Sequence, residues 1–315
     1  VLGFYPYMCS TYKDKALRRC VALEKAKAQT EEEALADEDK KKVYQYYMNP
    51  SKVAMAGKIQ PNGSYLKGIE DFIPSSQYNC DKHHLKVVED IKENWVTLSL
   101  NSKFHALLAT ESIPEAIAYY RLLRKEMPTL KVTALFDPNI DNTGGQTFKE
   151  EGLIEVLEGY KEQFGKTYTM STHAAFKQDV ALRLAHKKPY NGKDFTKDKQ
   201  IDLLIVVNQM LTGFDSKWIN TLYVDKVMEY ENIIQAFSRT NRLFGPDKPF
   251  GVIRYYRYPN TMKRNIDKAV AMYSDNKPLK LFADPLTHNL QQMNSIYTEI
   301  EYLFVHAGIK NFETL

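Results

Sequence analysis

Residues 201–208 read IDLLIVVN, and the unbroken apolar run from Leu203 to Val207 is the clearest indication of fold class in this chain. A strand with one face in water alternates apolar and polar residues, so a run of this kind predicts a strand buried on both faces. Four further segments read as strands: FHALLAT (104–110), KVTALFD (131–137), TLYVD (221–225) and GVIRYY (251–256). Several of them are also apolar on both faces.

The segments between these strands have helical periodicity. They are EAIAYYRLLRKEM (115–127), FKEEGLIEVLEGYKEQF (148–164), AAFKQDVALRLAH (174–186) and ENIIQAFSRTNRLF (231–244). Strands buried on both faces that alternate with helices indicate a mainly parallel sheet with helices on both faces. The sequence therefore predicts an α/β domain over residues 96–260.

The flanking segments lack this alternation. Residues 1–95 combine helical stretches, KALRRCVALEKAKAQ (15–29), EEEALADEDKKKVYQYYM (31–48) and LKVVEDIKENWVTL (85–98), with a loop-rich stretch between 49 and 80. We expect a mostly helical connector there. Residues 261–315, which include MKRNIDKAVAMYS (262–274) and PLTHNLQQMNSIYTEIEYLFVHAG (285–308), are expected to begin a helical C-terminal region.

Composition sets broad limits on function. The chain has 315 residues, with 43 Lys and Arg against 39 Asp and Glu, so its net charge of +4 does not by itself indicate nucleic-acid binding. Its three cysteines are too few and too widely spaced for a disulfide framework, which favours free thiols in the cytoplasm. No apolar run is long enough for a membrane span, and no signal peptide is visible. Without a starting Met, we expect a piece of a longer chain.

Two predicted strand-end loops carry residues suited to ligand binding, because ligands of open α/β sheets bind beyond the carboxyl ends of the strands. After residues 201–208, Thr212, Gly213 and Asp215 offer a hydroxyl, close backbone approach and a carboxylate. The alternative is an ordinary Asx-type turn. After residues 104–110, Thr110 and Ser112 precede a helix and could contact phosphate, or cap that helix.

The predicted helix over 231–244 carries Gln235, Arg239 and Arg242, spaced by four and three residues. In a continuous α-helix this spacing places the three polar heads on one face. Such a face can converge on an anionic ligand. The alternative is a solvated basic surface or a pair of structural salt bridges.

The sequence LLIVVNQMLTGFDS (203–216), followed by IIQAFSRTNR (233–242), resembles motifs V and VI of superfamily 2 helicases. The sequence from TGFDS through LYVDKVMEYENIIQAFSRTNRLF is similar to the second RecA-like motor domain of the R (HsdR) subunit of type I restriction enzymes. AAFKQDVALRL and FHALLATESIPEAIAYY, the latter at the position of motif IV, are similar to that family too. The resemblance covers residues 85–270, with the flanks more loosely similar.

The resemblance implies roles for each of these residues. Arg239 and Arg242 would reach across a domain cleft to the phosphates of ATP, and Gln235 would complete the polar strip. Gly213 and Asp215 would take part in the nucleotide site and couple it to DNA. The hydroxyls of Thr110, Ser112 and Thr212 would contact DNA backbone phosphates.

The resemblance also implies cofactors and partners. In the parent protein, ATP and Mg²⁺ would be held mainly by the first motor domain, so none is expected in this chain. The partners would be double-stranded DNA and the modification (methyltransferase) and specificity subunits of a cytoplasmic restriction complex, with no membrane.

Several motifs of a complete enzyme are missing from the sequence. There is no GxxxxGK[ST] phosphate loop, because NTGGQTF (142–148) lacks the lysine and the hydroxyl that follows it. There is also no DExH-type acidic motif and no nuclease motif, so we expect half of an ATPase site that is inactive alone. The alternatives are the second domain of another superfamily 2 helicase or remodeller, or a non-catalytic DNA-binding scaffold module.

Two further patterns carry less weight. Cys80, His83 and His84 form a CxxHH sequence, but no second ligand pair follows, so we predict no metal site. The segment RYYRYP (254–259) could be a basic, aromatic track for nucleic acid, or a sheet strand whose tyrosines pack.

Overall fold

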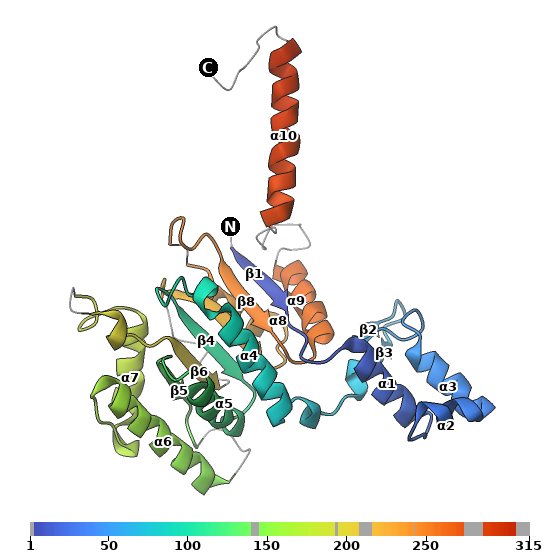
Figure 1. Cartoon of the computed structure of the whole chain (residues 1–315), viewed down its shortest axis with the longest axis horizontal. Coiled ribbons are helices and arrows are strands. Elements are labelled where there is room, and N and C mark those ends of the chain that lie inside the picture. The colour runs from blue at the N-terminus through green and yellow to red at the C-terminus, as the bar shows by residue number, and fades with distance from the viewer. Residues whose placement is uncertain are drawn as a thin grey trace.

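The structure, a computed structural model, describes residues 3–139, 145–192, 195–207, 216–242, 244–273 and 286–306 (Figure 1). Its centre is a six-stranded sheet in the order β1-β8-β7-β4-β6-β5, and every neighbouring pair in it is parallel. The strands are β1 (Phe4–Met8), β4 (His105–Thr110), β5 (Val132–Leu135), β6 (Leu203–Val207), β7 (Ile219–Asp225) and β8 (Gly251–Tyr255). The five predicted strands and the α/β class are confirmed.

Strand β1 was not predicted. The sequence indicated no strand before residue 95, yet Phe4–Met8 pairs in parallel with β8 and extends the sheet. Pro6 lies in this strand, which is tolerated because an edge strand leaves one row of backbone groups unpaired. Phe4 is fully buried, and this burial holds β1 on the sheet. The segment assigned to the connector therefore contributes to the sheet itself.

Helices cover both faces of the sheet, as expected. On one face Asp90 of α4 (Asp81–Leu98) binds Arg254 of β8. On the other, Phe237 of α8 (Tyr230–Phe237) packs edge-on against Phe4, with 5.3 Å between ring centroids. The remaining helices of the domain are α5 (Ile113–Glu126), α6 (Gln146–Phe164), α7 (His173–Leu184) and α9 (Pro259–Tyr273).

The connector forms a small helical lobe beside the sheet (Figure 1). It contains α1 (Asp14–Lys25), α2 (Glu31–Ala36), α3 (Glu38–Met48) and a hairpin of β2 (Lys58–Ile59) and β3 (Tyr65–Leu66). Asp37 separates α2 from α3 because its carboxylate accepts from the first backbone N–H groups of α3, at Asp39 and Lys40. Buried Glu70 accepts from the backbone N–H groups of Asn260 and Thr261, which ties the lobe to the start of α9. Farther along the chain lies α10 (Leu286–His306).

Candidate functional site

The segment with the predicted arginines does not form one continuous α-helix. Helix α8 ends at Phe237, and Ser238–Thr240 form a 3₁₀ turn. Ser238 and Thr240 donate their hydroxyls to the carbonyls of Gln235 and Phe237, at 2.7 and 3.0 Å, and these bonds compete with the helical pattern. The prediction that one α-helical face holds the three polar residues is therefore wrong in its geometry.

The three residues lie in three different parts of this segment. Gln235 is exposed on α8, Arg239 is half-buried in the 3₁₀ turn, and Arg242 is exposed beyond it. Their proposed contact with ATP stays a prediction, because its test needs the nucleotide.

The arginine segment is held firmly against the amino ends of two strands. Asn241 accepts a hydrogen bond from the backbone N–H of Gly3 at 2.7 Å, just before β1. Thr240 packs closely against Gly251, the first residue of β8. A Cβ added at Gly251 would lie 2.6 Å from the Thr240 carbonyl oxygen. Helix α8 thus begins near the carboxyl end of β7 and delivers Arg239 to the opposite edge of the sheet.

Thr110 and Ser112 lie at the carboxyl edge, away from that segment. Thr110 is fully buried and donates its hydroxyl to the Ser112 carbonyl at 3.3 Å. Ser112 is the N-cap of α5, and its hydroxyl accepts from the Glu115 backbone N–H at 3.4 Å. These contacts favour the capping alternative for Ser112, and phosphate binding by either residue stays a prediction. Thr212, Gly213 and Asp215 lie outside the described residues.

Between the strand ends lies a buried ion network that the sequence did not predict. Arg257 donates to Glu115 Oε1 at 3.0 Å and to Asp225 Oδ2 at 3.1 Å. Tyr119 donates its hydroxyl to the same Asp225 oxygen at 2.7 Å. His83 Nε2 lies 2.7 Å from the other Asp225 oxygen. The sequence signal was a carboxylate at the end of a predicted strand, TLYVD, without any indication of its partners.

The pKa values of the two carboxyl groups in this network are shifted in opposite directions. Burial would raise the pKa of Asp225, but the His83 hydrogen bond, the Arg257 charge and the Tyr119 hydroxyl together lower it to about 2. Burial raises the pKa of Glu115, although the Arg257 charge opposes this rise. Asp225 is therefore ionised and firmly held, which suits a structural anchor better than an acid–base catalyst.

The histidine of this network also fastens the N-terminal segment. Thr11, just beyond the end of β1, has its hydroxyl 2.8 Å from His83 Nδ1. His83 is fully buried between Thr11 and Asp225, so both of its ring nitrogens are engaged within the protein. In the part of the chain that the structure describes, no group of three or more His, Cys, Asp or Glu is placed to hold a metal ion.

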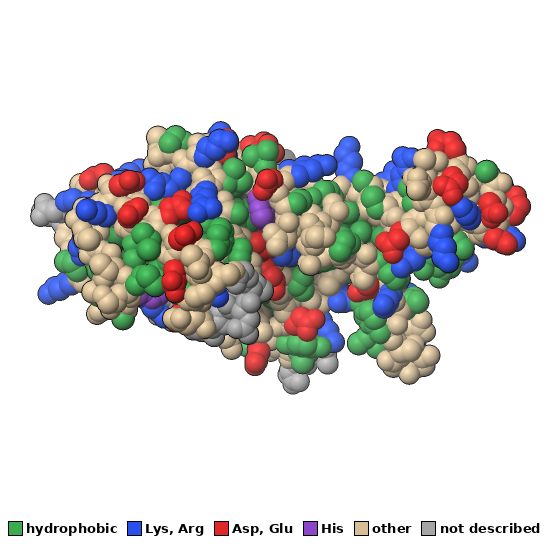
Figure 2. Space-filling model, turned by 90° about the horizontal axis from the view of Figure 1, so that it is seen from below, with side chains coloured by type: hydrophobic (Ala, Val, Ile, Leu, Met, Phe, Trp, Pro, Cys, Tyr) green, Lys and Arg blue, Asp and Glu red, His purple; other side chains and the backbone are tan. Residues whose placement is uncertain are grey.

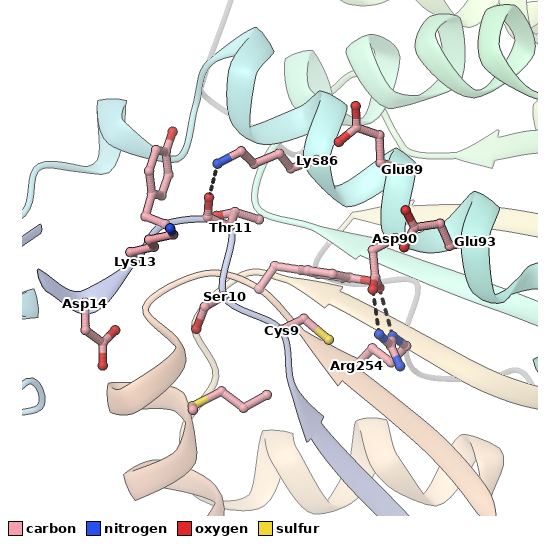
Figure 3. Close-up of a pocket in the computed structure, with 13 residues that line it drawn as sticks. Cys9, Ser10, Thr11, Lys13, Asp14, Lys86, Glu89, Asp90, Glu93 and Arg254 are labelled. Atoms are coloured by element: carbon pink, nitrogen blue, oxygen red, sulfur yellow. Dashed lines mark hydrogen bonds and ion pairs between the residues drawn. The ribbon is translucent and has the colours of Figure 1, made fainter. Parts of the chain in front are cut away.

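A cavity of about 770 Å³ opens beside this network, between the end of β1 and α4 (Figure 3). Among the groups that line it, Arg254 and Tyr256 both bind Asp90, at 2.8 and 2.7 Å, and Lys86 donates to the Thr11 carbonyl. Burial raises the pKa of the Cys9 thiol to about 12, so it stays protonated and is a poor nucleophile. The Cys9 thiol is therefore not an activated nucleophile.

The segment RYYRYP is not an exposed nucleic-acid track. Tyr255, Tyr256 and Arg257 are each at most 3% exposed, which confirms the packing alternative. On the face that Figure 2 shows, Lys and Arg side chains are mixed with Asp and Glu. No helix among the described residues is long and apolar enough to cross a membrane.

Comparisons with known proteins give a consistent result. Residues 102–258 match the family described as type I restriction enzyme subunit R domain 3. A type I restriction enzyme endonuclease subunit of Staphylococcus aureus is 35% identical over 203 residues, which cover 62% of this chain and 21% of that protein. A corresponding subunit of Staphylococcus saprophyticus is 36% identical over 201 residues, 61% of this chain and 20% of that protein.

A shorter match is a putative type I restriction enzyme endonuclease subunit N-terminal part of Mycoplasma pneumoniae, 50% identical over 70 residues, which are 22% of this chain and 18% of that protein. Among solved structures, the C-terminal part of the Fun30 ATPase domain aligns with 83% of this chain and 68% of its own, with a TM-score of 0.34 and 10% identity. The matched region spans about a fifth of the length of these curated relatives.

Proposed function

Because the chain belongs to the family of type I restriction enzyme R subunits, we propose that residues 96–260 form the second RecA-like motor domain of an ATP-dependent double-stranded DNA translocase. Residues 1–95 would connect it to the preceding parts of the subunit, and residues 261–315 would begin a helical C-terminal region. In the complete type I enzyme, this translocase would be coupled to DNA cleavage.

The observation that carries this proposal is the path of α8 across the sheet. The helix starts beside the carboxyl edge, where Thr110 and Ser112 lie, and ends at the amino edge, where Arg239 and Arg242 lie. A motor domain needs two such surfaces, one for DNA and one for the nucleotide of a neighbouring domain. One rigid helix between them can couple changes at the two surfaces.

The exposed Arg242 fits a nucleotide contact across a domain cleft, since its guanidinium is permanently charged and can reach outward. Bound ATP with Mg²⁺ would supply the phosphoanhydride bond whose cleavage drives movement. Arg239 and Arg242 would stabilise charge that develops on the transferring phosphoryl group, and Gln235 would orient polar groups beside it. Gly213 and Asp215 are proposed to line the same site.

The partners follow from the same proposal. Double-stranded DNA would be gripped through backbone phosphates, since a translocase has to bind every sequence it passes. Thr110, Ser112 and Thr212 are the proposed contacts from motifs IV and V. The modification and specificity subunits of a type I complex would select the DNA site, in the cytoplasm.

The test is Arg242→Ala in the full-length subunit. We expect loss of DNA-stimulated ATP hydrolysis, with folding and DNA binding near those of wild type. Arg19→Ala is the control, because Arg19 is an exposed arginine of α1 that pairs with Glu31 at 3.2 Å. Unchanged ATP turnover in Arg242→Ala would remove the nucleotide role, and failure to bind DNA instead would favour the scaffold alternative.

A second measurement concerns this chain alone. Because it contains no phosphate loop, titration calorimetry should detect neither tight ATP binding nor hydrolysis. Micromolar affinity for ATP would contradict the division of the site between two domains.

A further inference from the structure

A groove of about 630 Å³ lies between the β2–β3 hairpin, the start of α8 and the first three turns of α9. Lys58 and Tyr65 line it from the hairpin, Tyr230 from the start of α8, and Arg264 and Lys268 from α9. We call it the hairpin groove. Because α8 and α9 begin just beyond the carboxyl ends of β7 and β8, the groove opens at the same edge of the sheet as Thr110.

The hairpin groove presents two aromatic rings, each beside a cation. Arg264 donates to the Tyr65 hydroxyl at 2.9 Å, and its guanidinium carbon lies 5.8 Å from that ring centre. Lys268 donates to the Tyr230 hydroxyl at 3.2 Å, and its ammonium lies 5.0 Å from that ring centre. Tyr65 is 47% and Tyr230 45% exposed, so both rings can contact a ligand.

The backbone at Tyr230 is strained. Its φ of +48° is in the left-handed region, which is unusual for a bulky residue and costs about 1–3 kcal/mol. Asn265 donates to the carbonyl of buried Met228 at 2.9 Å and so holds the turn that leads into Tyr230. The fold thus maintains an unfavourable conformation that leaves a large ring in solvent, as binding sites often do.

The charge of the hairpin groove favours an anionic ligand. Lys58, Arg264 and Lys268 face two carboxylates, Asp71 and Glu229. Asp71 is directed into the hairpin, where it accepts from the Tyr65 hydroxyl at 2.9 Å and from the Gly68 backbone N–H at 2.7 Å. Lys58, Arg264 and Lys268 therefore face one exposed carboxylate, Glu229, in the open part of the groove, which leaves a net positive charge there.

We propose that the hairpin groove binds the phosphodiester backbone of duplex DNA. Lys58, Arg264 and Lys268 would pair with consecutive phosphates, and the rings of Tyr65 and Tyr230 would pack against deoxyribose. Lysine, arginine and tyrosine are typical of such sequence-independent backbone contacts. The inference rests on the proposed DNA translocase. It adds the β2–β3 hairpin of the connector, which precedes the motor motifs in the sequence, to the DNA-binding surface.

The test is the salt dependence of duplex binding by the full-length subunit, measured by fluorescence anisotropy with a labelled duplex of arbitrary sequence. Each lysine–phosphate pair adds about 0.9 to the steepness of the plot of log K against log salt concentration, so Lys58→Ala/Lys268→Ala should reduce that steepness by about 2. Both lysines are exposed, so the variant should fold normally. Tyr230→Ala should weaken binding without changing the slope, because it removes no charge.

The matched control is Lys40→Ala/Lys42→Ala, which removes the same charge from exposed ion pairs around α3. Equal slopes for this control and the groove variant would overturn the proposal, as would an effect confined to single-stranded DNA. These outcomes are separate from the translocase assignment. That assignment fails if the wild-type subunit shows no DNA-stimulated ATP hydrolysis, whatever the groove variants do.

Discussion

Replacing Arg257 by methionine should destabilise this chain far more than replacing an exposed arginine. Arg257 is 3% exposed and is bonded to two buried carboxylates, Glu115 at 3.0 Å and Asp225 at 3.1 Å. Methionine fills most of the space but leaves both carboxylates without their cation. Breaking a buried ion pair by removing one partner costs about 3–5 kcal/mol, and we expect Arg257→Met to fall in this range.

The assay is guanidinium chloride denaturation near neutral pH, followed by tryptophan fluorescence. Arg121→Met is the control, since Arg121 pairs with Glu155 at 2.6 Å on the surface, with the two side chains 50% and 39% exposed. This exposed pair should contribute at most about 1 kcal/mol. Arg257→Met/Glu115→Gln should regain about 1 kcal/mol or more relative to Arg257→Met, because one unpaired charge has been removed.

Two results would refute this reasoning about the network. The first is a cost for Arg257→Met no larger than that of Arg121→Met, which would mean that the buried charges are solvated or relax freely. The second is a double variant less stable than Arg257→Met, which would show that Glu115 stabilises the fold by contacts other than its pairing with Arg257.

Two further predictions concern neighbouring positions. Because the pKa of Asp225 falls from its ordinary 3.8 to about 2, its ionised form stabilises the fold above pH 3.8 and this contribution disappears as pH drops through about 2. The difference in free energy of unfolding between wild type and Asp225→Asn should therefore shrink on acidification, and a constant difference would contradict the anchor role. Gly251→Ala should cost about 1–3 kcal/mol, because the new Cβ collides with Thr240. In the full-length subunit Gly251→Ala should also lower ATP turnover more than Gly159→Ala, whose new Cβ collides with Tyr120 at a site away from the arginine segment. An equal decrease in the two variants would contradict a link between Gly251 packing and the arginines.

Local sequence patterns were sufficient to predict most of the sheet. Strands β4 to β8 are short segments whose residues are almost all buried. A run of apolar residues predicts a buried strand even when the strands that pair with it are not known. Strand β1 escaped prediction because FYPYM is short, carries a proline and lies at an edge with one side exposed. Its identity as a strand depends on pairing with β8, a segment almost 250 residues away, as in the Phe4–Gly251 pair.

The candidate site was also predicted only in part: the sequence identified its residues but not the directions of their side chains. The residues of the motif VI segment, Gln235, Arg239 and Arg242, were read directly from the sequence. Their directions were not, because Ser238 and Thr240 end the α-helix through bonds to its carbonyls. Helical spacing indicates a common face only while the helix continues.

The chain's own residues were enough to establish the α/β class, the order of its main strands along the chain and the family resemblance, since each depends on residues that are neighbours in sequence. The partners of Asp225 could come only from the folded molecule. His83 is 142 residues from it in sequence, Tyr119 is 106 and Arg257 is 32, and the order of strands in the sheet brings them together. Hydrophobic periodicity indicates which face of a segment is buried, whereas the choice among distant polar partners depends on how all the buried segments pack at once.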